Sequence, residues 1–142
     1  MGGRMNTSRF TLAPRLAFDT AVVRSLALCE VLLMNDWRYP WLILVPRRDG
    51  LVELSDLGED EQAVIWQEVK RASSALRAVG PFEKLNPAAL GNIVRQLHVH
   101  LVARNSGDFA WPGPVWGHGQ AVAYGDEQLK ARIAALQAGL AG

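Results

Sequence analysis

The sequence predicts an α+β protein with a mainly antiparallel sheet, one long helix over it and a C-terminal helix. Three observations predict this class: two short apolar runs joined by a turn, a long stretch with helical periodicity, and a later stretch that alternates strictly between apolar and polar residues. The chain has 142 residues. That length suits a single domain over residues 1–142, because domains commonly contain about 100–150 residues.

The two apolar runs predict a β-hairpin. They cover Ser25 to Asn35 and Trp41 to Val45, and Asn-Asp or proline residues bound them. Short apolar runs rich in β-branched and aromatic residues, fenced by turn residues, are typical of buried strands, although a buried helix segment gives the same pattern. Cys29, the only cysteine, lies in the first run and is expected to be buried there.

Two stretches predict amphipathic helices. The first runs from Glu59 to Val79, with three acidic residues in its first turn and Gly80-Pro81 after its end. The second follows Asp126, which is expected to be its N-cap. Steps of three and four residues place these apolar side chains on one face of each helix: Ile65, Val69, Ala72, Leu76 and Val79 in the first, and Leu129, Ile133, Leu136 and Leu140 in the second.

The segment Leu85 to Arg104 is the most informative part of the chain. Its first half contains the turn-forming pairs Asn86-Pro87 and Gly91-Asn92. Its second half alternates between an apolar set (Leu97, Val99, Leu101) and a polar set (Gln96, His98, His100). Successive side chains of a strand point to opposite faces, so the polar set shares one face with neighbours about 6–7 Å apart. The sequence therefore predicts an amide and two imidazoles that could hold one ligand together.

Four interpretations of the two histidines remain open on this pattern alone. They could be polar residues on a half-solvated strand, or ligands of a metal with the help of His118, Cys29 or a carboxylate. An imidazole with its usual pKa near 6.5 also offers a lone pair at neutral pH, so one histidine could attack a phosphorus atom while the other donates to a phosphoryl oxygen. The fourth interpretation is a binding site without turnover.

Composition excludes several classes of protein. The net charge of +1 is too small to collect DNA or RNA, so the expected partner is a small molecule. No apolar run approaches the 20 or so residues of a membrane span. Residues 1–9 lack the apolar core of a secretory signal, which together with the single cysteine favours a cytoplasmic location.

The run Gln96-Leu97-His98-Val99-His100-Leu101-Val102 resembles the histidine triad motif, in which three histidines alternate with apolar residues, of the HIT superfamily of nucleotide hydrolases and transferases. The resemblance covers about residues 25–104. It includes Leu44-Val45-Pro46-Arg47 after the hairpin, Leu85-Asn86, Gly91-Asn92 and Arg104. Residues 110–141 contain a loop rich in aromatic residues, Ala110 to Gly119, which we call the aromatic loop, and the C-terminal helix. This part of the chain is similar to the tryptophan-containing C-terminal ends of the family.

The resemblance implies a HIT-like fold, a homodimer and a nucleotide hydrolase. The substrate would be a dinucleoside polyphosphate or a nucleoside phosphoramidate, cleaved at its α-phosphorus through a nucleotidyl-histidine intermediate. His98 matches the nucleophile, and His100 matches the histidine that hydrogen-bonds the phosphoryl group. No metal site and no tightly bound cofactor are implied, and Mg²⁺ would accompany only the substrate phosphates.

Further site residues follow from the same resemblance. Asn92 and Asn86 match polar residues near the phosphate, and Asn35 matches the residue that reads the ribose hydroxyls. Arg104, like the two histidines, is at an even-numbered position, so it shares their face of the strand and is expected to bind phosphate. Arg95 is at an odd-numbered position and is expected to point away from the site.

Three positions depart from the family pattern. Gln96 replaces the first histidine, so hydrogen bonding is kept while an ionisable group is lost. Ile93 stands in place of a Ser or Thr, and Trp41 in place of a Gly-His pair. A nucleotide-binding protein with little turnover and a His-x-His metal enzyme therefore remain alternatives.

The tryptophans divide into two groups. Trp66 lies on the first predicted helix and is expected to have a packing role. Trp111 and Trp116 could serve either a dimer interface or a base pocket.

Overall fold

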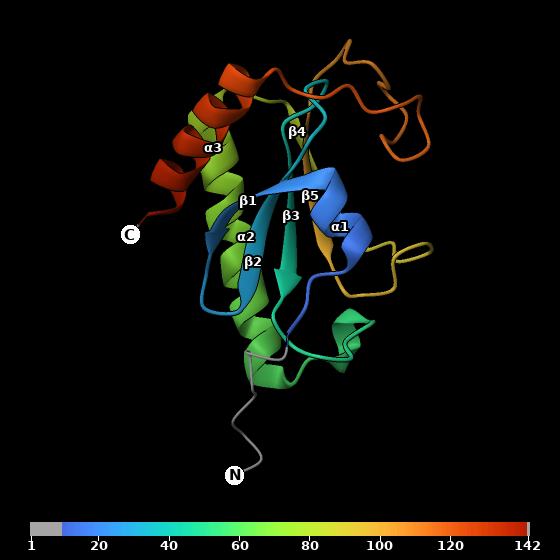
Figure 1. Cartoon of the computed structure of the whole chain (residues 1–142), viewed down its shortest axis with the longest axis vertical. Coiled ribbons are helices and arrows are strands. Elements are labelled where there is room, and N and C mark those ends of the chain that lie inside the picture. Colours follow the sequence, from blue (N-terminus) through green and yellow to red (C-terminus); the bar gives the residue numbers. More distant parts are fainter. Residues whose placement is uncertain (1–9, 142) are drawn as a thin grey trace.

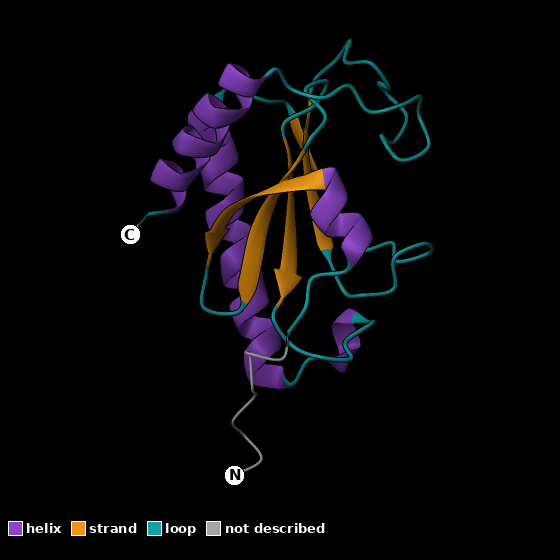
Figure 2. Cartoon of the chain, in the orientation of Figure 1, coloured by secondary structure: helices purple, strands orange, loops and turns teal. Residues whose placement is uncertain are grey.

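The computed structural model describes residues 10–141 as a five-stranded antiparallel sheet with helices on both faces (Figures 1 and 2). The strand order is β1-β2-β3-β5-β4. The strands are β1 (Thr20–Ser25), β2 (Cys29–Met34), β3 (Trp41–Pro46), β4 (Lys84–Ala88) and β5 (Val99–Arg104). The helices are α1 (Pro14–Asp19), the short 3₁₀ turn η2 (Leu54–Asp56), α2 (Glu59–Val79) and α3 (Asp126–Leu140). The predicted α+β class with a mainly antiparallel sheet is confirmed.

Two expectations from the sequence concern the ends and the membrane. The prediction that residues 1–9 hold no secretory signal falls outside the described residues. Within residues 10–141, no helix is both long and apolar enough to cross a membrane.

The predicted hairpin is confirmed, although its first strand is shorter than the apolar run. Strands β2 and β3 pair antiparallel, and the run's first residues form the turn before β2, where the Leu26 N–H donates to the Cys29 carbonyl at 2.8 Å. The sequence did not reveal α1 and β1. Only Val23 of β1 is buried, so this edge strand carries no apolar run, and six residues are too few for α1 to show a helical period.

Helix α2 has the predicted bounds, and two details of the helices correct the sequence interpretation. The N-cap of α3 is Gly125, and Asp126 is the first helical residue, where its charge favours the helix dipole without capping it. Trp66 does not pack in the core, because the solvent-facing side of α2 leaves it 62% exposed. The pair Asn86-Pro87 lies within β4 and forms no turn; β4 is an edge strand, where a residue without an N–H is tolerated.

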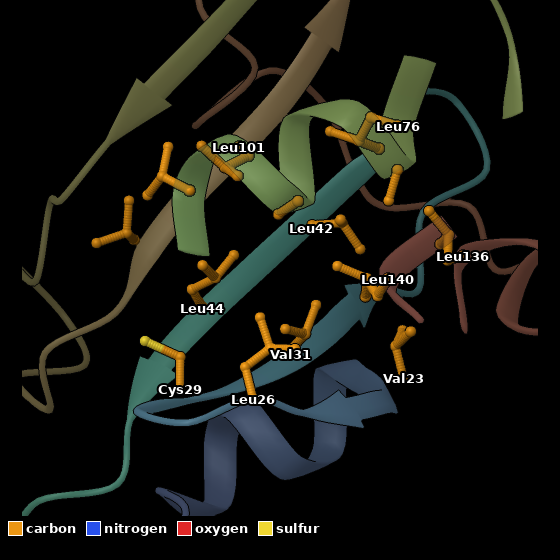
Figure 3. Packing of buried hydrophobic residues seen from close by; sticks show 14 of the residues in the cluster. Val23, Leu26, Cys29, Val31, Leu42, Leu44, Leu76, Leu101, Leu136 and Leu140 are labelled. Atoms are coloured by element: carbon orange, nitrogen blue, oxygen red, sulfur yellow. The ribbon is translucent and has the colours of Figure 1, made fainter. Parts of the chain in front are cut away.

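One face of the sheet packs against α2 and α3 (Figure 3). Leu42, Leu44 and Leu101 come from the sheet, Leu76 from α2 and Leu136 from α3. The predicted burial of Cys29 is confirmed in this layer. Leu97, Val99 and Leu101 all belong to this cluster, so the predicted direction of the apolar set is confirmed.

The opposite face of the sheet is also covered, which decides the environment of the histidines. Helix α1 crosses in front of the sheet (Figure 1), and residues 10–13 precede it on the same side. The loop between β5 and α3 supplies further cover from Ala110, Val115 and Trp116. The buried members of this second cluster are Leu16, Leu32, Tyr39, Trp41, Ile43, Val45, Val102, Ala110 and Val115. The sheet therefore has apolar layers on both faces.

Candidate active site

The two histidines lie side by side on the second face of the sheet, at the start of β5. His100 pairs with Ile43 of β3 and with Ala88 of β4. The centroids of the His98 and His100 rings are 4.8 Å apart, and the two residues are only 6% and 5% exposed. The shared face predicted from the alternation is confirmed, but it is buried rather than half-solvated.

Hydrogen bonds fix which nitrogen of each ring carries a proton. The His98 Nδ1 atom lies 2.7 Å from the Gln96 carbonyl oxygen. A carbonyl can only accept, so His98 donates from Nδ1 and its Nε2 holds a lone pair when the ring is neutral. The Trp41 indole Nε1–H donates to Nδ1 of His100 over 3.1 Å. An indole can only donate, so the neutral His100 carries its proton on Nε2. The pair therefore offers one lone pair and one N–H donor.

The surroundings of His100 keep it neutral. Burial lowers the pKa of the His100 imidazole to about 3, with His98 adding to the effect. Two indoles pack around it, with ring-centroid distances of 5.8 Å to Trp41 and 5.3 Å to Trp116. The buried Trp116 Nε1–H has no hydrogen-bond partner among the described residues. His100 is thus a neutral donor held within an aromatic enclosure.

A pocket of about 240 Å³ opens beside His98. Gln96 and Asn92 line it with His98, so three of the predicted site residues meet there. Arg95 lines it as well, which corrects the expectation that this residue points away. The strand begins only at Val99, so the alternation does not extend back to position 95. Sequence reasoning missed Arg95 because the conformation of the preceding loop leaves no periodic signal.

The Gln96 side chain makes contacts that the sequence did not reveal. Its Oε1 accepts the Ala13 N–H at 2.8 Å, and its Nε2 donates to the Thr11 carbonyl at 2.9 Å. The catalytic role predicted for Gln96 is untested, and in this structure its amide binds the chain segment that precedes α1.

Arg104 bonds to Asn86 and to the loop between β5 and α3. Nε and Nη2 of Arg104 donate three hydrogen bonds of 2.8–2.9 Å, to both Asp108 carboxylate oxygens and to the Gly113 carbonyl. Nη1 donates a fourth, of 2.8 Å, to Asn86 Oδ1. Arg104 is 1% exposed. It lies at the end of β5 opposite the histidines. The phosphate contacts predicted for Arg104 and Asn86 stay predictions. The geometry gives Arg104 the role of holding the loop onto the sheet.

Asn35 lies at the β2–β3 turn. Its Oδ1 accepts the Tyr124 N–H at 2.9 Å, next to Asp36, which is ion-paired with Arg38. These bonds hold the segment before α3 onto the turn. The ribose contact predicted for Asn35 is untested.

The described residues contain no group of three or more His, Cys, Asp or Glu side chains that could hold a metal ion. Cys29 packs on the helix-covered face of the sheet, opposite the histidines, and His118 lies in the exposed loop. Neither residue is thus placed to complete the His-x-His pair as a metal site.

Comparison with known proteins gives a consistent result. The HIT domain model matches residues 15–107. A histidine triad protein from Sinorhizobium meliloti is 44% identical, with a TM-score of 0.92 over 95% of this chain and 100% of that one. A histidine triad protein from Bradyrhizobium japonicum is 46% identical, with a TM-score of 0.89 over 92% of this chain and 98% of that one. A histidine triad protein from Marinobacter aquaeolei is 45% identical, with a TM-score of 0.89 over 92% of this chain and 96% of that one. A search of curated proteins gives no match.

The depressed pKa of His100 predicts a pH dependence of stability. The unfolded chain binds a proton on this histidine near pH 6.5, whereas the folded protein does so only near 3. Its contribution is therefore complete above pH 6.5 and is lost as pH falls toward 3, by about 1.4 kcal/mol per pH unit within that window. Urea unfolding of His100→Gln should show this slope removed, and His118→Gln should retain it. Equal slopes in the two variants would contradict the assignment.

Loss of the Trp41 donor should release the proton position of His100. In the wild type, ¹⁵N NMR is expected to show a protonated Nε2 and an unprotonated Nδ1 on His100 throughout the neutral pH range. Among residues 10–141, Trp41 alone donates to Nδ1 of His100, so Trp41→Phe should give a mixture of tautomers. Trp66→Phe, an exposed tryptophan on α2, is the matched control and should leave the spectrum unchanged. An unmixed Nε2–H form in Trp41→Phe would show that another contact sets the tautomer.

Proposed function

Because the chain belongs to the HIT domain family, we propose that it is a nucleotide hydrolase that forms a covalent intermediate on His98. The observation that supports this most directly is the complementary protonation of the two rings. A lone pair on His98 Nε2 is what attack on phosphorus requires, and an N–H on His100 Nε2 is what a phosphoryl oxygen requires.

The proposed reaction has two displacements at the α-phosphorus. In the first, His98 Nε2 forms a bond to phosphorus while the bond from phosphorus to the leaving group breaks, and the leaving group keeps the electron pair. In the second, water attacks the phosphorus, the N–P bond breaks, and the imidazole lone pair is restored. The water's protons leave with the nucleoside monophosphate and the solvent. His100 stays neutral in both steps and donates to a phosphoryl oxygen.

The residues around the pocket favour a leaving group that departs as an anion. Gln96 carries an amide, which is not an acid, and the Ile93 side chain has no hydroxyl. The Glu53 carboxylate accepts a backbone N–H in the capping box of η2. Of the described residues that line the pocket, Arg95 alone carries a permanent positive charge. A polyphosphate leaves without being protonated and would meet Arg95, whereas an amine must take a proton. Among the substrates considered, we therefore favour a dinucleoside polyphosphate.

A second candidate function is nucleotide binding with little turnover. Ile93 is 93% exposed, and the Gln96 amide is already bound to the chain before α1, so neither residue assists the departure of a leaving group. Tight binding of a nucleotide without product formation would favour this second function.

The proposal extends to partners and cofactors as the family resemblance implies them. The protein would act as a homodimer, with no DNA or RNA partner and no resident cofactor, and Mg²⁺ would enter only with the substrate phosphates.

Replacement of His98 should abolish turnover while leaving the fold intact. His98→Asn is expected to lower kcat for diadenosine polyphosphate by about a thousandfold or more, because the nucleophile itself is removed. His118→Asn, in the exposed loop, is the matched control and should keep the wild-type rate. Rapid quenching in alkali, where an N–P bond survives, followed by mass spectrometry should find the nucleotidyl group on the peptide that contains His98. Equal turnover by both variants would refute the mechanism.

The choice of leaving group should follow from the groups around the pocket, because neither Gln96 nor Ile93 can protonate a leaving group. We expect kcat/KM for a diadenosine polyphosphate to exceed that for an adenosine phosphoramidate with an alkylamine. Introducing Gln96→His supplies an ionisable group and should shift this ratio toward the phosphoramidate. Arg95→Gln should shift it the same way by weakening the anhydride reaction alone. A wild-type preference for the phosphoramidate would contradict this view of the pocket.

A further inference from the structure

The segment before α1 makes two hydrogen bonds to one side chain of the imidazole face, that of Gln96. We refer to residues 10–13 as the strap. Gln96 bonds to the strap through both ends of its amide: Oε1 accepts from Ala13 N–H (2.8 Å) and Nε2 donates to the Thr11 carbonyl (2.9 Å). Both bonds go to the backbone, so they depend on where the strap lies and not on its side chains.

The strap covers the face on which the histidines lie. Phe10, Leu12 and Ala13 pack against the second apolar cluster. That cluster contains Ile43, the cross-strand neighbour of His100. Both imidazoles are about 95% buried beneath this cover and the aromatic loop. The pocket beside His98 is not lined by His100. A phosphorus atom that reacts at His98 while one of its oxygens contacts His100 therefore needs further room on the face that the strap covers.

We propose that Gln96 is the latch of the strap and thereby determines access to the imidazole pair. The inference rests on the proposed function, since it concerns entry of a nucleotide to that same site. When the two amide bonds break, residues 10–13 move off the face and His98 becomes accessible together with His100. When they re-form, the strap covers the face again, and the two rings cannot contact one phosphoryl group together. Gln96 is an access-determining residue, and it takes no part in the proposed bond changes.

The conformation of the strap permits a substitution that removes one bond only. Ala13 has φ −53° and ψ 135°, values that proline adopts without strain. Ala13→Pro deletes the N–H that donates to Gln96 and keeps the carbonyl that accepts from Ala17 at the start of α1. Ala13→Gly is the matched control, because it changes the side chain and keeps the donor.

Removing both bonds requires a change at the latch itself. Gln96→Leu eliminates the donor and the acceptor together. Gln67→Leu, at an exposed position on α2, makes the same chemical change away from the strap.

Carbethoxylation by diethyl pyrocarbonate measures access without relying on turnover. The reagent modifies unprotonated imidazole nitrogens, and peptide mass spectrometry follows His98 separately from the exposed His118, which serves as the internal reference. Loss of one hydrogen bond should increase the open population about twofold to tenfold. Ala13→Pro should therefore accelerate modification of His98 by that factor, and Gln96→Leu should accelerate it more. Ala13→Gly and Gln67→Leu should react at the wild-type rate.

Cys29 reports whether a variant has lost its fold rather than its latch. Its thiol is fully buried on the opposite face of the sheet, so a disulfide reagent should not reach it while the protein is folded. If Gln96→Leu exposes Cys29, Ala13→Pro decides the question alone. Unchanged His98 modification in Ala13→Pro with Cys29 still protected would overturn the latch.

Adenosine monophosphate separates the latch from the proposed function. If both hold, the nucleotide protects His98 from the reagent, and a lower concentration suffices in Ala13→Pro than in Ala13→Gly. Faster modification without protection by the nucleotide would support the latch and count against the nucleotide site. Equal protection in all variants, with equal modification rates, would support the nucleotide site and overturn the latch.

Discussion

The indole of Trp41 donates to Nδ1 of His100, and what the imidazole pair can do follows from the direction of that bond. An indole nitrogen never accepts, so the bond cannot reverse with pH or with the arrival of a substrate. Were His100 in the other tautomer, both rings would present lone pairs to an incoming phosphoryl group, and two acceptors would face its anionic oxygens. A histidine as the donor could carry its proton on either nitrogen. Tryptophan at position 41 removes that freedom.

Burial gives this arrangement its strength. The aromatic loop closes the far side of the face and is anchored by Arg104, whose bonds to Asp108 and to the Gly113 carbonyl lie beneath the surface. Trp116 from that loop packs against His100. Excluding water raises the cost of charging the imidazole, which explains the low pKa of His100, and it also strengthens any hydrogen bond that His100 donates. A buried arginine in a structural network thus contributes to a neutral donor at the other end of the strand.

Much of the fold could be predicted from periodicity, and much of the site could not. Helix α2 and the β2–β3 hairpin have long or strongly apolar patterns, and the alternation through His98 and His100 correctly assigned the two faces of β5. The alternation predicted the wrong direction for Arg95, because the strand starts later than the pattern suggests. The partners of Arg104 and Gln96 lie in other segments of the chain, and no local pattern predicts such distant contacts.

The strap must cover the imidazole pair and must also open to admit a substrate. The Gln96 amide is compatible with both states. Two amide hydrogen bonds contribute about 1–3 kcal/mol in total to the closed strap, in addition to the packing of Phe10, Leu12 and Ala13. A carboxylate in place of Gln96 could only accept hydrogen bonds from the strap backbone, and a cationic side chain could only donate them. Either one would also place a charge beside His98. The neutral amide satisfies a donor and an acceptor at once. Glutamine at position 96 therefore has no ionisable group and provides two opposite hydrogen-bonding ends, which is what a closure that must also open requires.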